Sequence, residues 1–151
     1  MVAMGLEDLR VFQMAEKLAD EVWVQAEKWE WFAKDTVGKQ LVRAVDSVGA
    51  NIAEAFGRFH YGEKLRFLYY ARGSLYETKY WLNRAKARQL MPVDTIQNLI
   101  EQVTQLAVQI NNFINSTKKQ KHNSQTIREV PPIYETENDL SDDDHIAWLT
   151  D

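Results

Sequence analysis

Cysteine is absent from the 151 residues of this sequence, which excludes disulfides, zinc–thiolate sites and thiol nucleophiles. No apolar run approaches the roughly 20 residues that a membrane helix needs, and the first residues lack the apolar core of a signal peptide. Proline occurs three times and glycine six times. We therefore expect one soluble, cytoplasmic chain without a membrane partner, long enough to bury a substantial core.

Charge is distributed unevenly along the chain, although the net value is only −4. Residues 1–121 hold 17 Lys and Arg against 14 Asp and Glu, whereas residues 122–151 hold one Arg against eight acids. We expect two parts: a mildly basic domain over 1–121, and a mostly disordered, acidic and polar tail over 122–151.

Apolar residues recur at three- and four-residue steps before Pro131, which is the spacing of one helix face. The pattern predicts helices over about 8–30, 35–58, 62–90 and 93–120, the last opening at Pro92 or just after it. No alternating stretch indicates a strand. Four long helices with short connections predict an all-α fold, an up-down-up-down four-helix bundle.

The second predicted helix has almost no solvated face. One sector holds small residues, namely Gly49, Ala50, Ala53 and Gly57, and we expect them to let another backbone approach, as in a subunit contact. A neighbouring sector is polar. Together with one acid of the third helix it supplies a predicted structural network: Arg43, Ser47, Asn51, Glu54, Arg58 and Glu77.

Two interpretations of that polar strip compete. Glu54 and Glu77 could form an acid/base pair, or the strip could be a buried hydrogen-bond network that fixes the helix register. The network is favoured, because no histidine, cysteine or metal-spaced carboxylate cluster accompanies the two acids. We expect no catalytic residue, no metal and no cofactor.

The spacing over two helices resembles a known family. The residues that carry it are Gln40, Arg43, Ala44, Ser47, the run Asn51-Ile52-Ala53-Glu54, Gly57-Arg58, Gly73-Ser74-Leu75 and Glu77, with the opening Leu6-Glu7-Asp8-Leu9, Val11 and Ala15. The pattern resembles the bacterial four-helix-bundle proteins encoded in intervening sequences of 23S ribosomal RNA genes. The accessory variability determinant of diversity-generating retroelements resembles these proteins and looks like a relative with the same fold.

The resemblance implies a homo-oligomeric, pentameric barrel of four-helix bundles without known catalysis. The retroelement relatives imply partners: nucleic acid (RNA or DNA) and a reverse transcriptase. Three residues depart from the family pattern: Gly49 stands where Pro is frequent, Ala55 where Gly is usual, and Ala33 where Pro is common. We expect a non-catalytic, oligomeric nucleic-acid-binding accessory protein, assisting a reverse transcriptase or associated with an rRNA intervening sequence.

Basic residues supply the candidate nucleic-acid contacts. Arg66, Arg84 and Arg88 fall on one side of the third predicted helix, and tyrosines follow on its flank, a mixture that can hold phosphates and stack on bases. Lys118, Lys119 and Lys121 end the fourth. The alternatives are an ordinary solvated face for the arginines and a favourable interaction with the helix dipole for the lysines.

The tail supplies the alternative function. Ile146, Trp148 and Leu149 form a short apolar cluster behind the acidic run Asp142-Asp143-Asp144, which is typical of a peptide that becomes ordered on binding. In this alternative the protein is an oligomeric scaffold whose tail recruits a partner protein. Plain disorder of the tail is the competing interpretation.

Overall fold

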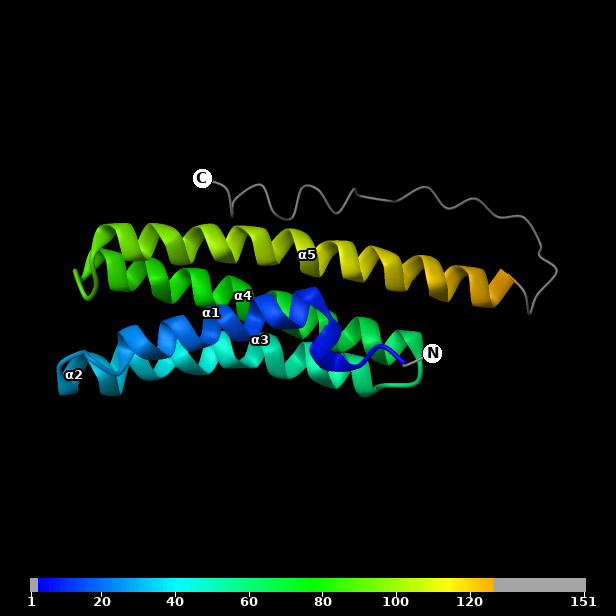
Figure 1. The fold of residues 1–151 in the computed structure, drawn as a ribbon, viewed down its shortest axis with the longest axis horizontal. Coiled ribbons are helices and arrows are strands. Elements are labelled where there is room, and N and C mark those ends of the chain that lie inside the picture. Colours follow the sequence, from blue (N-terminus) through cyan, green and yellow to red (C-terminus); the bar gives the residue numbers. More distant parts are fainter. Residues whose placement is uncertain (1–2, 127–151) are drawn as a thin grey trace.

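The computed structural model describes residues 3–126 (Figure 1). Within them, helices account for every regular element and no strand occurs. The elements in chain order are η1 (Leu6–Asp8), α1 (Arg10–Ala26), α2 (Trp31–Ala33), η2 (Lys34–Gly38), α3 (Lys39–Gly57), α4 (Tyr61–Ala87) and α5 (Val93–Thr126). The predicted all-α fold with four long helices is confirmed.

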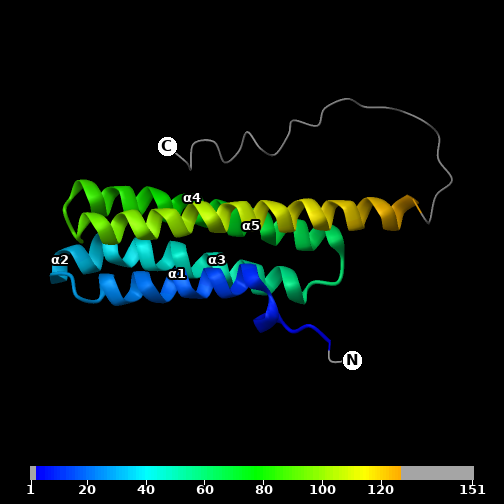
Figure 2. The same cartoon turned by 45° about the horizontal axis from the view of Figure 1, so that its top comes forward.

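The four long helices pack side by side along their length (Figures 1 and 2). The α1–α3 and α4–α5 connections lie at one end of the molecule, and the α3–α4 connection lies at the other. The last turns of α5 project beyond the α3–α4 connection in both views. The molecule therefore has two ends: one with the α1–α3 and α4–α5 connections, and one with the α3–α4 connection and the end of α5.

The core forms where the apolar faces of the helices meet. Leu18, Leu41, Leu68 and Leu106, one from each long helix, are almost completely buried. Full burial of one such leucine contributes about 1.5–3 kcal/mol. In proteins most of the stability of an amphipathic helix comes from tertiary packing and not from helix propensity, so this shared core is what holds the helices in place.

A π-helical segment, η2, precedes α3, so residues 31–57 form one continuous helical stretch. Gly38 ends η2 against the ring of Trp29: a Cβ on Gly38 would lie 3.3 Å from Trp29 Cε3. Trp29 itself is 9% exposed. Because Gly38 has no side chain, the indole of Trp29 can reach the core, although Trp29 lies in the short connection after α1.

The ends of α4 and α5 are set by local signals. Gln89 follows α4 with a φ of 54°, and Leu90 N donates to Ala85 O at 2.9 Å, a left-handed helix termination that usually employs glycine. Pro92 directly precedes α5, and its carbonyl accepts from Ile96 N at 3.0 Å. The predicted helix start at or just after Pro92 is confirmed.

Helix α5 is longer than the sequence pattern predicts. It continues to Thr126, six residues past the expected end at 120, so residues 122–126 are helical and do not belong to the tail. The apolar periodicity stops at Ile114, but a helix terminus continues through polar residues when nothing breaks it. The rest of the predicted tail, 127–151, lies outside the described residues.

Candidate nucleic-acid interface

Four of the six predicted nucleic-acid contacts gather at one end of the molecule. Lys118, Lys119 and Lys121 occupy the last turns of α5, and Arg66 lies in the second turn of α4. Lys121 Nζ would be 4.0 Å from a Cβ on Gly62, which places the α5 lysines beside the start of α4. Arg66 follows Gly62 by one turn, about 6 Å along the axis. These four cations are called the basic end below.

Two further cations, Arg58 and Lys64, lie near the basic end, at the junction of α3 and α4. Arg58 pairs with Glu54 and lies 3.9 Å from Glu63 Oε1, while its guanidinium covers the Phe67 ring at 4.7 Å. Lys64 Nζ donates to the carbonyls of Ala55 and Phe56, both at 3.3 Å. Lys64 thus satisfies carbonyl groups at the end of α3. Both cations serve the packing of α3 on α4 more than they offer charge to a ligand.

Arg84 and Arg88 do not join the basic end. They share the outward side of α4 with Arg66, but 18 residues of helix place Arg84 about 27 Å away from it. Arg84 is half-buried, and its Nε is buried without a hydrogen-bond partner in the described part of the chain. Arg88 is exposed beside a pocket of about 430 Å³ that Phe32, Ala33 and Leu90 also line. The structure separates the predicted set into two groups.

Sequence reasoning missed an exposed aromatic ring at the basic end. Phe59 is 89% exposed in the connection between α3 and α4, where its ring meets His60 edge to face at 5.3 Å. The exposure of Phe59 could have been predicted, because a phenylalanine in so short a connection has no helix face on which to be buried. An exposed ring beside several cations is the combination that binds single-stranded nucleic acid, because rings stack on bases while cations hold phosphates.

The predicted polar network is not a single buried cluster within the chain. Arg43, Glu54 and Glu77 are exposed. The hydrogen bonds of the strip are local: Asn51 Nδ2 donates to Ser47 O at 2.8 Å, Arg58 pairs with Glu54 four residues away, and Glu77 Oε1 accepts from Trp81 Nε1 at 3.3 Å. Such exposed pairs one turn apart stabilise a helix by only about 0.2–0.5 kcal/mol each. The helix register comes from the apolar core.

The small residues of α3 separate into two groups. Gly49 packs against α1 of the same chain, where a Cβ would meet Ala15 Cβ at 3.8 Å, and Ala50 and Ala53 line the same groove. Gly57 faces open space, since a Cβ placed there would meet nothing within 4 Å among the described residues. Close approach of α1 therefore explains part of the pattern that predicted a subunit contact.

That α1–α3 groove is acidic and measures about 350 Å³, with Glu16, Asp20 and Asp46 along it. Partial burial, and after it the neighbouring Asp20 carboxylate, raises the pKa of Asp46 above its ordinary value. The groove repels anions, so it is a poor place for phosphates. It is called the acidic groove below.

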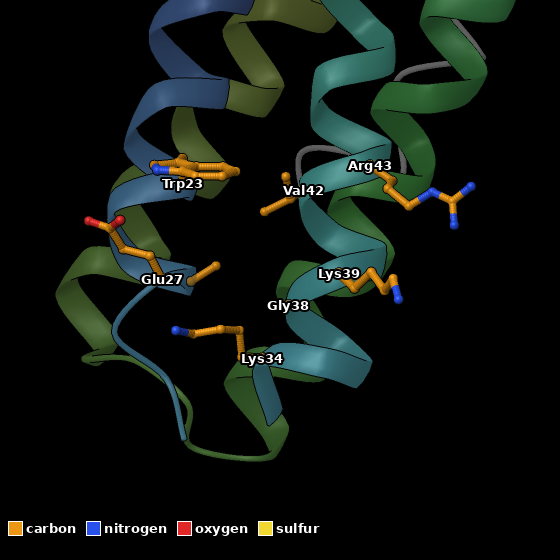
Figure 3. A pocket seen from close by; sticks show the side chains of 8 residues that line it. Trp23, Glu27, Lys34, Gly38, Lys39, Val42 and Arg43 are labelled. Carbon is orange, nitrogen blue, oxygen red and sulfur yellow. The ribbon is translucent and has the colours of Figure 1, made fainter. Parts of the chain in front are cut away.

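A second groove between the same elements is apolar, and it lies at the end opposite the basic end (Figure 3). It measures about 630 Å³ and is called the Trp23 groove. Its lining residues are Trp23, Ala26, Glu27, Lys34, Gly38, Lys39, Val42 and Arg43. Figure 3 shows Trp23 and Val42 pointing toward one another, with Lys34 reaching in from η2 while Lys39 and Arg43 extend away from α1. Trp23 is 56% exposed there.

Other predictions fall partly or wholly outside the described residues. Ile146, Trp148 and Leu149 lie in the part of the chain that the structure does not describe.

Within residues 3–126, no three His, Cys, Asp or Glu side chains are gathered as metal ligands would be. None of the helices in that range is both long and apolar enough to cross a bilayer.

Comparison with curated proteins gives no match. A solved structure of a protein with unknown function from the S23 ribosomal protein family of Bacteroides thetaiotaomicron is similar, with a TM-score of 0.63 and 20% identity over 69% of this chain and 97% of that one. At that identity the likeness supports the helical fold alone.

The family model of the 23S rRNA-intervening sequence proteins matches residues 7–112. The matched range takes in most of η1, all of α1 to α4 and the first 20 residues of α5, and it includes Arg66, Arg84 and Arg88. It stops before Lys118, so the lysines of the basic end lie beyond it. Because the match covers more than half of the sequence, this chain belongs to the 23S rRNA-intervening sequence protein family.

Proposed function

We propose that this protein is a non-catalytic, oligomeric nucleic-acid-binding accessory protein that holds a single strand at its basic end. The observation that carries the proposal is that Arg66, Lys118, Lys119 and Lys121 lie at the same end of the molecule as the exposed ring of Phe59. Cations neutralise phosphates whatever the sequence, and a ring stacks on any base. The expected ligand is therefore bound with little sequence preference.

RNA is the first ligand to test, because the family name refers to intervening sequences of 23S rRNA. Assistance to a reverse transcriptase remains part of the proposal: a protein that holds a template strand would support such an enzyme without chemistry of its own. The resemblance to the retroelement accessory protein is the support for that partner.

Oligomerisation is proposed with the helices alternating in direction within each bundle and five bundles in a ring. The outward face of α4 supports it, since Tyr69, Tyr70 and Tyr80 are 37%, 52% and 54% exposed around Gly73. A ring repeats the basic end once per copy, so the positive potentials add and raise the association rate with a polyanion.

Binding of a labelled single-stranded RNA of about 20 nucleotides, followed by fluorescence anisotropy with the full chain, tests the function. Affinity should fall steeply between about 50 and 200 mM salt, as counterion release requires. Light scattering on the same sample should give five times 17.6 kDa, about 88 kDa. A 17.6 kDa species would contradict the assembly, and absence of binding at the lower salt would contradict the function.

Phe59→Ala should weaken RNA binding by about 1–3 kcal/mol, the contribution of stacking on one base. Phe32→Ala is the matched control, because Phe32 is also well exposed, at 73%, but lies at the opposite end. Equal losses for the two variants would contradict a binding site beside Phe59.

A further inference from the structure

The Trp23 groove has a composition that the nucleic-acid function does not use. Its sides are an indole ring, a valine and small residues, so it favours an apolar side chain over a base with phosphates. Its floor includes the backbone of Gly38 and the short side chain of Ala26, which is 3% exposed. An exposed tryptophan over such a pocket leaves apolar surface that gains free energy when covered.

The residues that line the groove carry a net positive charge. Lys34, Lys39 and Arg43 contribute three cations to the lining, against one acid, Glu27. Lys39 is partly neutralised by Asp35, at 3.7 Å and well exposed. Figure 3 shows Lys34 extending from η2 toward the end of α1, whereas Lys39 and Arg43 extend away from the groove, so Lys34 is the cation that faces it. The groove therefore fits a peptide that carries carboxylates next to large apolar residues.

We propose that residues 142–149 of this same chain bind in the Trp23 groove. The segment reads Asp142-Asp143-Asp144-His145-Ile146-Ala147-Trp148-Leu149, with three acids followed by a cluster that includes three large apolar residues. Ile146, Trp148 and Leu149 supply the apolar surface, and the aspartates lie toward Lys34. Binding at this end leaves the basic end uncovered, so the inference does not depend on the nucleic-acid function.

The length of chain beyond α5 permits the contact. Helix α5 has 34 residues, about 51 Å at 1.5 Å per residue. Its start and the η2 segment lie at the same end of the molecule, so the groove lies about that far from Thr126 along the bundle, and about 10 Å to the side (Figures 1 and 2). The twenty residues 127–146 span about 66 Å when extended. The segment therefore reaches its own groove with length to spare.

Disulfide trapping in the full chain tests the proposal, because the natural sequence has no cysteine to interfere. The test variant combines Val42→Cys with Ala147→Cys, two small changes that keep Trp23, Ile146, Trp148 and Leu149. A disulfide requires Cα atoms about 4.4–6.8 Å apart, so it forms readily only when the segment occupies the groove. Oxidation with diamide is followed on non-reducing gels and by mass spectrometry.

The control variant combines Ala53→Cys with Ala147→Cys. Ala53 is half-buried like Val42 and lines the acidic groove between the same elements, which repels the three aspartates. It also lies nearer the end of the molecule where α5 finishes, so chance encounters of the tail favour the control. Circular dichroism of the reduced variants checks that both fold.

The Val42→Cys pair should form an intrachain disulfide at least about tenfold faster than the control, the factor expected from 1.4 kcal/mol of preferential binding. Adding Trp148→Ala and Leu149→Ala should return its rate to that of the control. Equal rates for the two pairs would overturn the proposal, and the groove would then belong to another ligand. Disulfides formed only between chains would also overturn it, in favour of the tail of a second copy.

Discussion

Gly49 and Gly38 show how two glycines in one helical stretch have opposite roles. Both lie within residues 31–57, and neither has a positive φ, so neither is required for an unusual backbone angle. A side chain at Gly49 would meet Ala15 at an ordinary contact distance of 3.8 Å, whereas one at Gly38 would press on Trp29 Cε3 at 3.3 Å and Ala33 O at 3.4 Å. The first position tolerates a methyl group and the second resists it.

Gly49→Ala should therefore stabilise the protein by about 0.5–1 kcal/mol, because alanine loses less backbone entropy in a helix. Gly38→Ala should give no such gain and should lower the free energy of unfolding, since the buried indole has to shift. Urea unfolding followed by circular dichroism measures both. A loss of stability at Gly49 would show that the space beside it is needed by something other than Ala15, such as a second copy.

Sequence reasoning is accurate for residues whose role depends on the period of one helix, and incomplete for those whose role depends on neighbouring helices. Spacing assigns Val11, Ala15, Leu18 and Val22 to one face, and all are buried. Spacing also assigns Gly49 to a small-residue face, but it does not reveal that the helix approaching that face is α1. The exposure of Trp23 shows that it lies off the buried face that Val22 shares.

Helices α1 and α3 approach along a face that carries acids as well as small residues. Asp46 on α3 has a raised pKa from partial burial and from Asp20 on α1. The folded chain therefore holds this proton up to a higher pH than the unfolded chain. The contribution of Asp46 to the free energy of unfolding is therefore greatest at low pH. It falls as the pH rises from the ordinary pKa of 3.8 through the raised pKa of the folded chain.

Asp46→Asn should raise the thermal midpoint at neutral pH and have no effect below about pH 3.8, where the unfolded carboxyl is also protonated. The gain should be a few tenths of a kcal/mol, because Asp46 is only partly covered and water screens its charge. Asp35→Asn is the control, since it removes an acid that faces Lys39 and should give no gain. A gain that persisted at low pH would point to a cause other than charge.

The end of α5 could not be located from the apolar pattern. Periodicity identifies the core-facing part of the helix but not its last turns, because the residues after Ile114 no longer need to face a core on every turn. The last turns of α5, up to Thr126, project beyond the α3–α4 connection (Figure 1). Lys121 lies beside Gly62 at the start of α4, so the α5 lysines precede these projecting turns.

The whole molecule has two chemically different ends. One is the basic end, where α3 connects to α4 and where Phe59 is exposed. The other exposes three aromatic side chains: Trp23, Trp31 and Phe32. The sequence pattern predicts Arg66, Arg84 and Arg88 on one side of a helix; Arg66 and Arg84 lie in α4, and Arg88 is the residue directly after it. Their separation along the helix follows from spacing, but the pattern could not show that the α5 lysines lie beside Arg66 and not beside Arg84, because that requires the connection between α4 and α5.

Binding of nucleic acid at the basic end can be tested by charge reversal with a matched control. Lys119→Glu with Lys121→Glu reverses two cations near the end of α5, and Lys86→Glu with Arg88→Glu reverses two near the end of α4. Both double variants change the net charge equally, so a general field effect would be the same in both. Each also replaces basic residues near a helix C-terminus.

We predict that the α5 variant weakens single-stranded RNA binding at least about tenfold. The slope of log K against log salt should also fall by about 1.4, or 0.7 for each lost phosphate contact. The α4 variant should stay within about twofold of the unmodified chain. Equal weakening by the two variants, or greater weakening by the α4 variant, would contradict the assignment of the basic end as the nucleic-acid site.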